Sequence, residues 1–266
     1  MPPSASVDPA ASARAVGLAG LIGALSDDPH RPRLVSHLPG GGRTELSGAS
    51  LANWTAKVAG LLRDELGAAL GDVVAVLLPP GWQTAPVLLG CWWAGMTVTG
   101  EDDPSAAAAF VAPSGDADAD EVFVVSGHPL GAPATDLADH QRDFTTAVLP
   151  QSDRLGAAAD TGDGWIAVRS ARGEVPAGAL AQRASAAAEQ LTAAVVGPAA
   201  RPVLLSSAAW ELPGGVARTL LAALAADGTL VQCAPGLSGD EVAAIAAAER
   251  AAATIGIDVA GLPRLD

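Results

Sequence analysis

Continuous apolar runs alternate along this chain with segments whose apolar residues recur at helical spacing. Val73–Leu78 is an uninterrupted apolar run, as expected of a strand that is covered on both faces. A helix through Leu88–Trp93 then leads into a second strand at Met96–Val98, and such a crossover is right-handed by default. The alternation returns in the second half, where it predicts strand Trp165–Val168, helix 176–194, strand Val203–Ser206, helix 213–226, strand Thr229–Gln232, helix 239–253 and strand Thr254–Ile257. This order predicts the α/β class, with largely parallel sheets and packed helices.

The N-terminal part of the chain carries shorter patterns of the same kinds. Apolar residues at 18, 21, 22 and 25 have helical spacing and predict an amphipathic first helix. Gly40–Gly42 separates two strand-like segments and predicts a β-hairpin. Ser47 or Ser50 caps the next helix, which runs over 51–67. Two further short strands are predicted around Phe110–Ala112 and Val122–Val125.

The stretch 126–163 is polar and rich in glycine and proline, which is typical of a boundary between structural units. We therefore predict a single domain over 1–266, with lobe one at 1–125, a linker region at 126–163 and lobe two at 164–266. A chain of 266 residues is long enough to bury a substantial core.

Charge and cysteine usage narrow the classes of function. The formal net charge is −14, so the surface repels phosphate backbones and anionic lipid, and we expect no nucleic-acid and no membrane partner. Cys91 and Cys233 lie in separate apolar runs without metal-ligand spacing and are predicted to be small buried hydrophobes. The apolar segment 15–25 is followed by SDDPHRP instead of a small-residue cleavage site, and no apolar stretch is long enough to span a bilayer. These features predict a cytoplasmic protein whose partner is another protein or a second copy of itself.

Short motifs with a known mechanism give mostly negative results. Lys57 is the only lysine, which excludes a phosphate-binding loop that ends in Gly-Lys-Ser/Thr. GDGWIA at 162–167 fits a dinucleotide-loop pattern, but it leads into a strand-like segment instead of opening a helix, and we reject it. Ser238 in GLSGD starts a predicted helix and is interpreted as an N-cap, not a nucleophile. GDADADE at 115–121 lacks the spacing of a calcium loop and is interpreted as a solvated turn.

The four histidines are scattered singly, with no acid or nucleophile at a recognisable spacing, and are interpreted as surface residues. The sequence therefore predicts no catalytic residue and no metal ligand.

Two segments resemble the AMP-binding, acyl-activating enzymes, which include acyl-CoA synthetases, adenylation domains and luciferases. Residues 43–98 are similar to the opening of that family, which has a T-x-x-E-L strand (here Thr44-Glu45-Leu46), a long helix, GD-x-VA-x-LLP and a helix that ends in AG. Asp103-Pro104 resembles the DP pair that follows, and 203–235 resembles a later strand, aromatic or His site, helix and L-x-x-G-x-x-V. The resemblance implies the fold of a truncated N-terminal domain of adenylate-forming enzymes. It also implies ATP or AMP with Mg²⁺ as cofactors.

The resemblance further implies a phosphate loop at 165–176, WIAVRSARGEVP. In working family members this loop is rich in hydroxyl residues, ends in a lysine and a glycine, and clasps the ATP phosphates. Arg169, Ser170, Arg172 and Gly173 stand at that place here, without the hydroxyl run and without lysine. We interpret them as a degenerate phosphate-loop position, and an ordinary strand-to-helix turn with solvated arginines is favoured over a working clamp.

Trp210 stands where the family often has a His or an aromatic residue at the rim of the acyl pocket, and core packing is the alternative interpretation. TGD at 161–163 resembles the ribose-binding triplet of the family, but it precedes the phosphate loop and is treated as a coincidence. The chain is also expected to end before the later ATP-binding elements and the C-terminal lid of the family.

Three functions remain open at this point. The favoured one is a catalytically degenerate AMP-binding-like domain that acts as a nucleotide or acyl sensor, or as a partner-binding domain. The second is an ATP-dependent, adenylate-forming half-enzyme, such as an acid–thiol ligase, completed by another chain. The third is an unrelated α/β interaction domain. On the favoured hypothesis ATP and AMP, with or without Mg²⁺, bind weakly or not at all.

Overall fold

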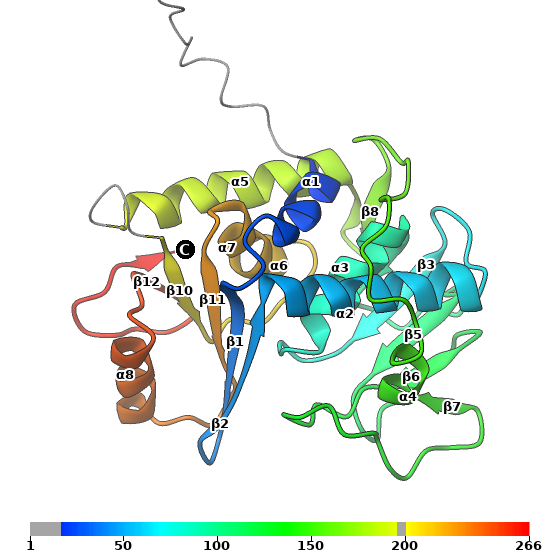
Figure 1. The fold of residues 1–266 in the computed structure, drawn as a ribbon, viewed down its shortest axis with the longest axis horizontal. Helices are drawn as coiled ribbons and strands as arrows, with labels where there is room; N and C mark the ends of the chain where they lie inside the picture. Colours follow the sequence, from blue (N-terminus) through cyan, green and yellow to red (C-terminus); the bar gives the residue numbers. More distant parts are fainter. Residues whose placement is uncertain (1–16, 196–200, 266) are drawn as a thin grey trace, which may run out of the picture.

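Strands and helices alternate along the chain in the structure, a computed structural model that describes residues 17–195 and 201–265 (Figure 1). The strands are β1 (Pro32–Leu38), β2 (Gly42–Ser47), β3 (Val73–Leu77), β4 (Thr97–Thr99), β5 (Ala108–Val111), β6 (Val122–Val124), β7 (Gln141–Asp143), β8 (Ile166–Ser170), β9 (Gly173–Pro176), β10 (Val203–Ser206), β11 (Thr229–Cys233), β12 (Ala253–Ile255) and β13 (Arg264–Leu265). The helical segments are α1 (Leu18–Gly23), η2 (Ala24–Ser26), α2 (Gly48–Gly60), η3 (Leu61–Glu65), α3 (Thr84–Ala94), α4 (Phe144–Val148), α5 (Ala177–Ala193), α6 (Gly214–Val216), η4 (Ala217–Leu221), α7 (Ala222–Ala225) and α8 (Gly239–Ala248).

The strands form two sheets that follow the same plan. The first has the order β13-β12-β10-β11-β1-β2, and the second has the order β7-β6-β5-β3-β4-β8-β9. Neighbouring strands are parallel in both sheets except in the two edge hairpins, β1–β2 and β8–β9. The predicted α/β class with largely parallel sheets is confirmed.

Local sequence patterns locate most of these elements. The hairpin around Gly40–Gly42 is present, and Ser47 caps α2 by accepting a hydrogen bond from the Ser50 amide. Ser238 begins α8 with a capping box in which Glu241 bonds back to the Ser238 amide, so its interpretation as an N-cap is confirmed. The first predicted helix is found at α1 and η2, while residues 15 and 16 lie outside the described part of the chain.

Several predictions need correction. The predicted helix over 239–253 ends at Ala248, because Arg250 adopts a left-handed φ of 57° and the chain turns into β12. The linker region 126–163 contains β7 and α4, and the segment 165–176 is a β8–β9 hairpin, not a strand-to-helix turn. β7 and β9 are short edge strands, and no hydrophobic alternation marks them in the sequence, because β7 is Gln-Arg-Asp and β9 has Val175 as its single buried residue.

Sheet membership crosses the predicted lobes. β1 and β2, from the segment 1–125, pair within the sheet that contains β10–β13, while β8 and β9, from the segment 164–266, complete the other sheet. The two sheets are thus connected twice by the chain, which places loops from both halves at the junction between them. The lobe boundaries themselves stay a prediction.

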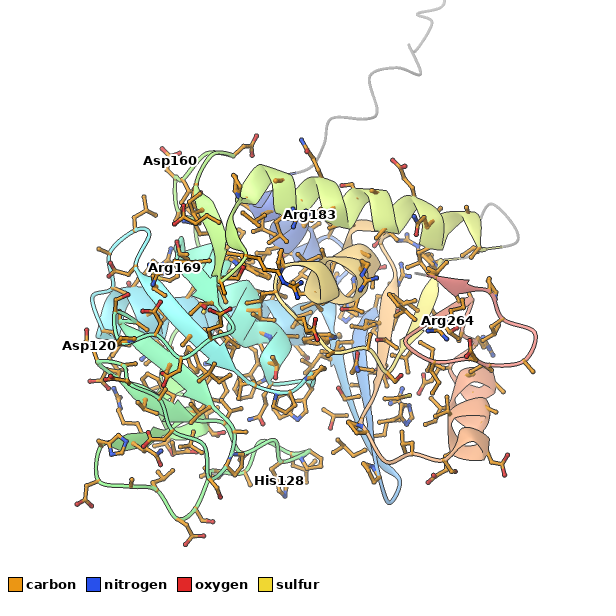
Figure 2. All side chains as sticks on the ribbon, turned by 180° about the vertical axis from the view of Figure 1, so that it is seen from behind. Asp120, His128, Asp160, Arg169, Arg183 and Arg264 are labelled. Atoms are coloured by element: carbon orange, nitrogen blue, oxygen red, sulfur yellow. The ribbon has the colours of Figure 1, made fainter. Side chains whose placement is uncertain are left out.

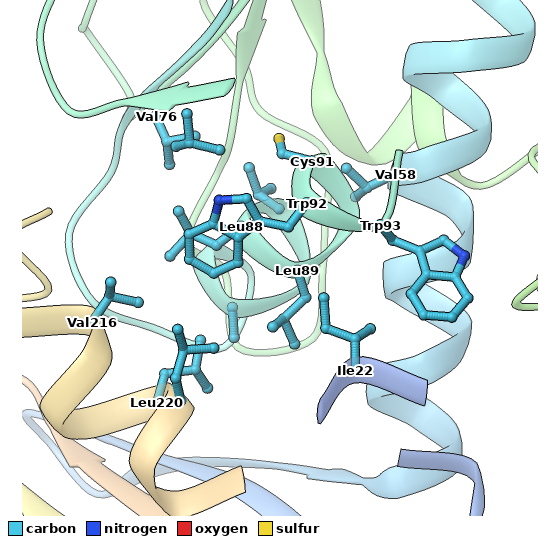
Figure 3. Packing of buried hydrophobic residues seen from close by; sticks show 14 of the residues in the cluster. Ile22, Val58, Val76, Leu88, Leu89, Cys91, Trp92, Trp93, Val216 and Leu220 are labelled. Carbon is cyan, nitrogen blue, oxygen red and sulfur yellow. The ribbon is translucent and has the colours of Figure 1, made fainter. Parts of the chain in front are cut away.

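A shared hydrophobic core joins the two sheets. Val74 and Val76 of β3 point into this core, while Val73 and Ala75 point to the opposite face, as the alternation of a strand requires. The central helix α3 is buried over its whole length. Figure 3 shows Trp92 and Trp93 on different sides of α3, with Trp93 close to α2.

The remaining faces are covered by helices. α8 packs Val242 and Ala246 against the outer face of the first sheet, and α5 runs along the other side of the molecule beside α7 (Figure 1). Within residues 17–195 and 201–265, no helix has the length and apolar character needed to cross a membrane.

Candidate functional site

A cleft of about 590 Å³ lies where loops from both sheets meet. The loop after β3, the turn after β8 and the segment 209–212 that precedes α6 form its walls. In open α/β sheets, ligands bind outside the carboxyl ends of parallel strands, where loops diverge to opposite sides of the sheet. This cleft has that position. It brings Ser170 and Arg172, from the predicted phosphate-loop position, together with Trp210, which the sequence analysis identified for a different reason.

The turn between β8 and β9 forms the polar wall of the cleft. Gly173 has a φ of 119°, which only glycine adopts readily, and its carbonyl accepts a hydrogen bond from Ser170 Oγ at 3.2 Å. Ser170 Oγ also accepts from the Arg172 amide at 3.3 Å. The Ala171 amide donates to Glu101 Oε1 at 3.0 Å. Two successive backbone amides of the turn are therefore already paired, and one of them holds a carboxylate.

Arg169 is directed elsewhere. Its Nη2 atom contacts Asp103 and donates to Ser105 Oγ at 3.0 Å, and Arg169 is not among the residues that line the cleft. Hydrogen bonds from the Ser105 hydroxyl and amide, together with Arg169, hold the pKa of Asp103 below its usual range. Figure 2 shows Arg169 on the second sheet. The arginine thus fixes the loop after β4 through an ion pair.

The charges on the cleft wall are mainly negative. Arg172 is exposed at the turn, while Glu101 and Glu211 are exposed on neighbouring loops of the same cleft. With one cation against two carboxylates, the lining does not compensate the charge of a polyanion.

Trp210 forms the apolar wall and is 7% exposed. Its Nε1 atom donates to Gln232 Oε1 at 3.1 Å, and the Gln232 amide in turn donates to the Ala208 and Cys233 carbonyls at 3.3 Å each. The indole is therefore a packed core residue that also lines the cleft, and its role at the rim of an acyl pocket stays a prediction.

One histidine departs from the surface interpretation. His37 is only 14% exposed at its side chain, and its Nε2 atom lies 2.9 Å from Glu249 Oε1, which also accepts from Arg43 Nε at 2.8 Å. The bond from Arg43, followed by that from His37, lowers the pKa of Glu249. Sequence spacing could not reveal this partner, because His37 and Glu249 are 212 residues apart. The other histidines, His30, His128 and His140, are exposed.

The two cysteines are buried and free, as predicted. Burial raises the pKa of the Cys91 thiol, and burial with the nearby Glu249 carboxylate raises the pKa of Cys233 to about 11. Burial thus favours the protonated form of both thiols near neutral pH, which disfavours nucleophilic chemistry at either one.

A magnesium-bound nucleoside triphosphate does not fit the residues that line this cleft. The phosphates would need free backbone amides and cations, whereas the Ala171 amide holds Glu101 and Arg172 is the single cation among the described residues of the lining. Among the residues that the structure describes, no group of three His, Cys, Asp or Glu side chains could hold a metal ion.

The fold and the position of the cleft define a class of two-sheet α/β proteins with a site at the junction of the sheets. The sequence profile of the family described as "AMP-binding enzyme" matches residues 24–170, and the chain belongs to this family. It is 40% identical over 235 residues to a "TIGR03089 family protein" of Mycobacterium tuberculosis (strain ATCC 25618 / H37Rv), covering 80% of this chain and 89% of that protein.

Solved structures share this fold at low sequence identity. An acyl-CoA synthetase of Brucella canis superposes with a TM-score of 0.73 at 17% identity, over 94% of this chain and 50% of its own. The N-terminal domain of FACL13 from Mycobacterium tuberculosis superposes with a TM-score of 0.66 at 13% identity, over 90% of this chain and 62% of its own. The chain thus spans about half the length of the first of these structures. Its fold is that of the N-terminal domain of adenylate-forming enzymes.

Proposed function

We propose that this member of the AMP-binding family does not form acyl adenylates by itself, and that its cleft acts as a sensing or partner-binding surface. The observation that carries the proposal is the hydrogen bond from the Ala171 amide to Glu101. In the turn that the sequence resemblance assigns to the phosphate loop of the family, a carboxylate of the chain itself accepts a hydrogen bond from a backbone amide. A phosphate entering the turn would have to displace Glu101 and would meet its negative charge.

The energetics support the proposal. Adenylation requires a carboxylate aligned on the α-phosphorus while the charge of the leaving pyrophosphate is neutralised. Like charges repel one another, and solvent weakens this repulsion at an exposed surface without changing its sign. Glu101 and Glu211 together outweigh Arg172 in the cleft, so the site disfavours the developing charge instead of stabilising it.

Thermal denaturation with nucleotides tests this proposal. For the wild-type protein we expect no shift in melting temperature with millimolar Mg-ATP, AMP or an acyl-adenylate mimic. Glu101→Ala frees the Ala171 amide and removes one negative charge. AMP should therefore raise the melting temperature of this variant measurably. Glu174→Ala is the matched control. It removes an exposed carboxylate from the β8–β9 hairpin, which carries Ala171, without freeing the Ala171 amide.

Pyrophosphate exchange separates the proposal from the half-enzyme alternative. The purified chain should show no carboxylate-dependent ATP–pyrophosphate exchange with short or long acids. Exchange that is lost in Arg172→Ala would contradict the proposal and support an adenylate-forming half-enzyme. Membership of the AMP-binding family already excludes the third alternative, an unrelated α/β domain. A cytoplasmic location and a protein partner or second copy stay predictions.

A further inference from the structure

A second cavity of about 220 Å³ lies beyond the Trp210–Gln232 contact. It shares with the cleft only the segment 78–80 and Thr84. β1 and β11 contribute His37 and Gln232 from the first sheet, and the loops after β5 and β6 contribute Pro113 and Gly127 from the second. The cavity is thus a separate space at the junction of the sheets.

Trp82 gives this cavity a rigid apolar wall. The residue is 6% exposed, and its indole meets Trp54 edge to face with 5.4 Å between ring centroids. Its Nε1 atom donates to the His128 carbonyl at 3.2 Å. The loop that carries His128 is fixed to β2, because Thr44 Oγ1 donates to the Pro129 carbonyl at 3.0 Å. Figure 2 shows His128 on this loop, at the side facing the β1–β2 hairpin.

Two polar side chains of the cavity lining have no partner among the described residues. Gln83 is 2% exposed, and neither its Nε2 nor its Oε1 atom is hydrogen-bonded. Ser36 is 4% exposed, and its Oγ atom is also without a bond. The other polar groups are occupied: Thr84 Oγ1 donates to the Pro79 carbonyl, and the Gln232 amide is bonded at both atoms. Buried polar groups in native proteins almost always have a partner, so Gln83 requires one donor and one acceptor from a water or a ligand.

The charge of the cavity limits what that ligand can be. Over the described part of the chain, the lining contains no lysine, arginine, aspartate or glutamate, and its single titratable residue, His37, is bonded to Glu249. A buried anion or cation would therefore lack a counter-charge, which is costly at low dielectric. A flat ring is a favourable partner for an aromatic wall residue such as Trp82, and a neutral amide offers the acceptor and the donor that Gln83 lacks.

We propose that this cavity binds a neutral, ring-bearing carboxamide or lactam, whose amide pairs with Gln83 while its ring packs on Trp82. The inference does not rest on the proposed function, because it concerns a different cavity and involves no nucleotide. The proposed ligand is not a carboxylic acid, because the group that the cavity would recognise is an uncharged amide.

Calorimetric titration with benzamide and benzoate tests this proposal in the wild-type protein. The two probes have nearly the same shape. Benzamide is neutral and has a hydrogen-bond donor, whereas benzoate is an anion and has none. Benzamide should bind about tenfold or more tightly than benzoate, the effect expected when a buried hydrogen-bonding group is left unpaired. Equal binding of the two probes, tighter binding of benzoate, or no detectable binding of benzamide would overturn the proposal.

A variant assigns the binding to the cavity. Gln83→Leu preserves the approximate volume and removes both amide atoms, so benzamide affinity should fall about tenfold or more. Gln190→Leu is the matched control, because Gln190 is exposed on α5, and its benzamide affinity should equal that of the wild type. Unchanged binding in Gln83→Leu would also refute the proposal. The benzamide–benzoate comparison in the wild type decides the question if Gln83→Leu does not fold.

Discussion

Trp210 Nε1 donates a hydrogen bond to Gln232 Oε1 at 3.1 Å, and this contact stands between the two cavities of the protein. Trp210 lines the cleft on one side, and Gln232 lines the apolar cavity on the other. Trp210 lies in the segment after β10, and Gln232 lies in β11, a strand of the first sheet. This hydrogen-bonded pair, together with the segment 78–80 and Thr84, which line both spaces, therefore lies between a polar, solvent-facing cleft and an apolar cavity.

Replacement of Trp210 tests the energetic importance of this pair. Trp210→Phe leaves Gln232 Oε1 buried without its donor, which should lower the free energy of unfolding by about 1–3 kcal/mol beyond the lost ring area. Trp93→Phe is the matched control, because Trp93 is also 7% exposed and its Nε1 atom has no partner among the described residues. Urea denaturation should therefore show the larger loss for Trp210→Phe. Equal losses would mean that the hydrogen bond contributes nothing measurable.

The contact between α2 and α3 depends on Gly90. A Cβ atom at this position would lie 2.5 Å from Val58 Cβ and 2.9 Å from the Thr55 carbonyl oxygen, so Gly90→Ala should force the helices apart. We expect a loss of about 1–3 kcal/mol in the free energy of unfolding, as for other overpacked cores. Gly214→Ala, where a Cβ meets nothing within 4 Å, should leave stability unchanged or raise it slightly. A stable Gly90→Ala protein would show that the helices can separate at little cost.

Glu249 should make stability depend on pH in the acidic range. Its pKa is lowered in the folded protein, chiefly by the hydrogen bond from Arg43. A carboxyl group with a lowered folded pKa contributes stability above its unfolded pKa, and this contribution is lost as the pH falls through the folded pKa. The wild type should therefore be more stable than Glu249→Gln at pH near 7, and the difference should shrink on acidification to about 3.

Chemical denaturation of both proteins over that range measures the effect. Glu189→Gln, on the exposed side of α5, controls for the loss of one negative charge. A wild-type advantage that grows on acidification would contradict a lowered pKa for Glu249 in the folded protein.

The thiols should react only after unfolding. Cys91 is fully buried with a raised pKa, and the pKa of Cys233 is raised to about 11, so the thiolate fraction is small near pH 8. A disulfide reagent should label neither thiol in the native protein on the timescale of minutes and both thiols in urea. Rapid native labelling of Cys233 would show that the first sheet opens near β11.

Elements that depend on nearby residues can be predicted from the amino-acid sequence alone. Val203–Ser206 is predicted as a strand with the bounds that the structure shows, because a short apolar run between polar segments suits a covered strand. Ser238 is identified as a cap from its place at the start of a helix, and the structure adds Glu241 as its partner in a capping box. Membership of the AMP-binding family is also visible in the order of motifs over 43–98.

The construction of the two sites, by contrast, depends on tertiary contacts. Glu101 reaches the Ala171 amide across 70 residues, and His37 reaches Glu249 across 212, so no spacing along the chain could reveal either pair. The edge strand β7 consists of Gln141, Arg142 and Asp143, and its backbone pairing with β6 fixes it as a strand without any hydrophobic pattern. Local patterns record which residues avoid water, whereas the partner of a polar group depends on where the folded chain brings distant segments together.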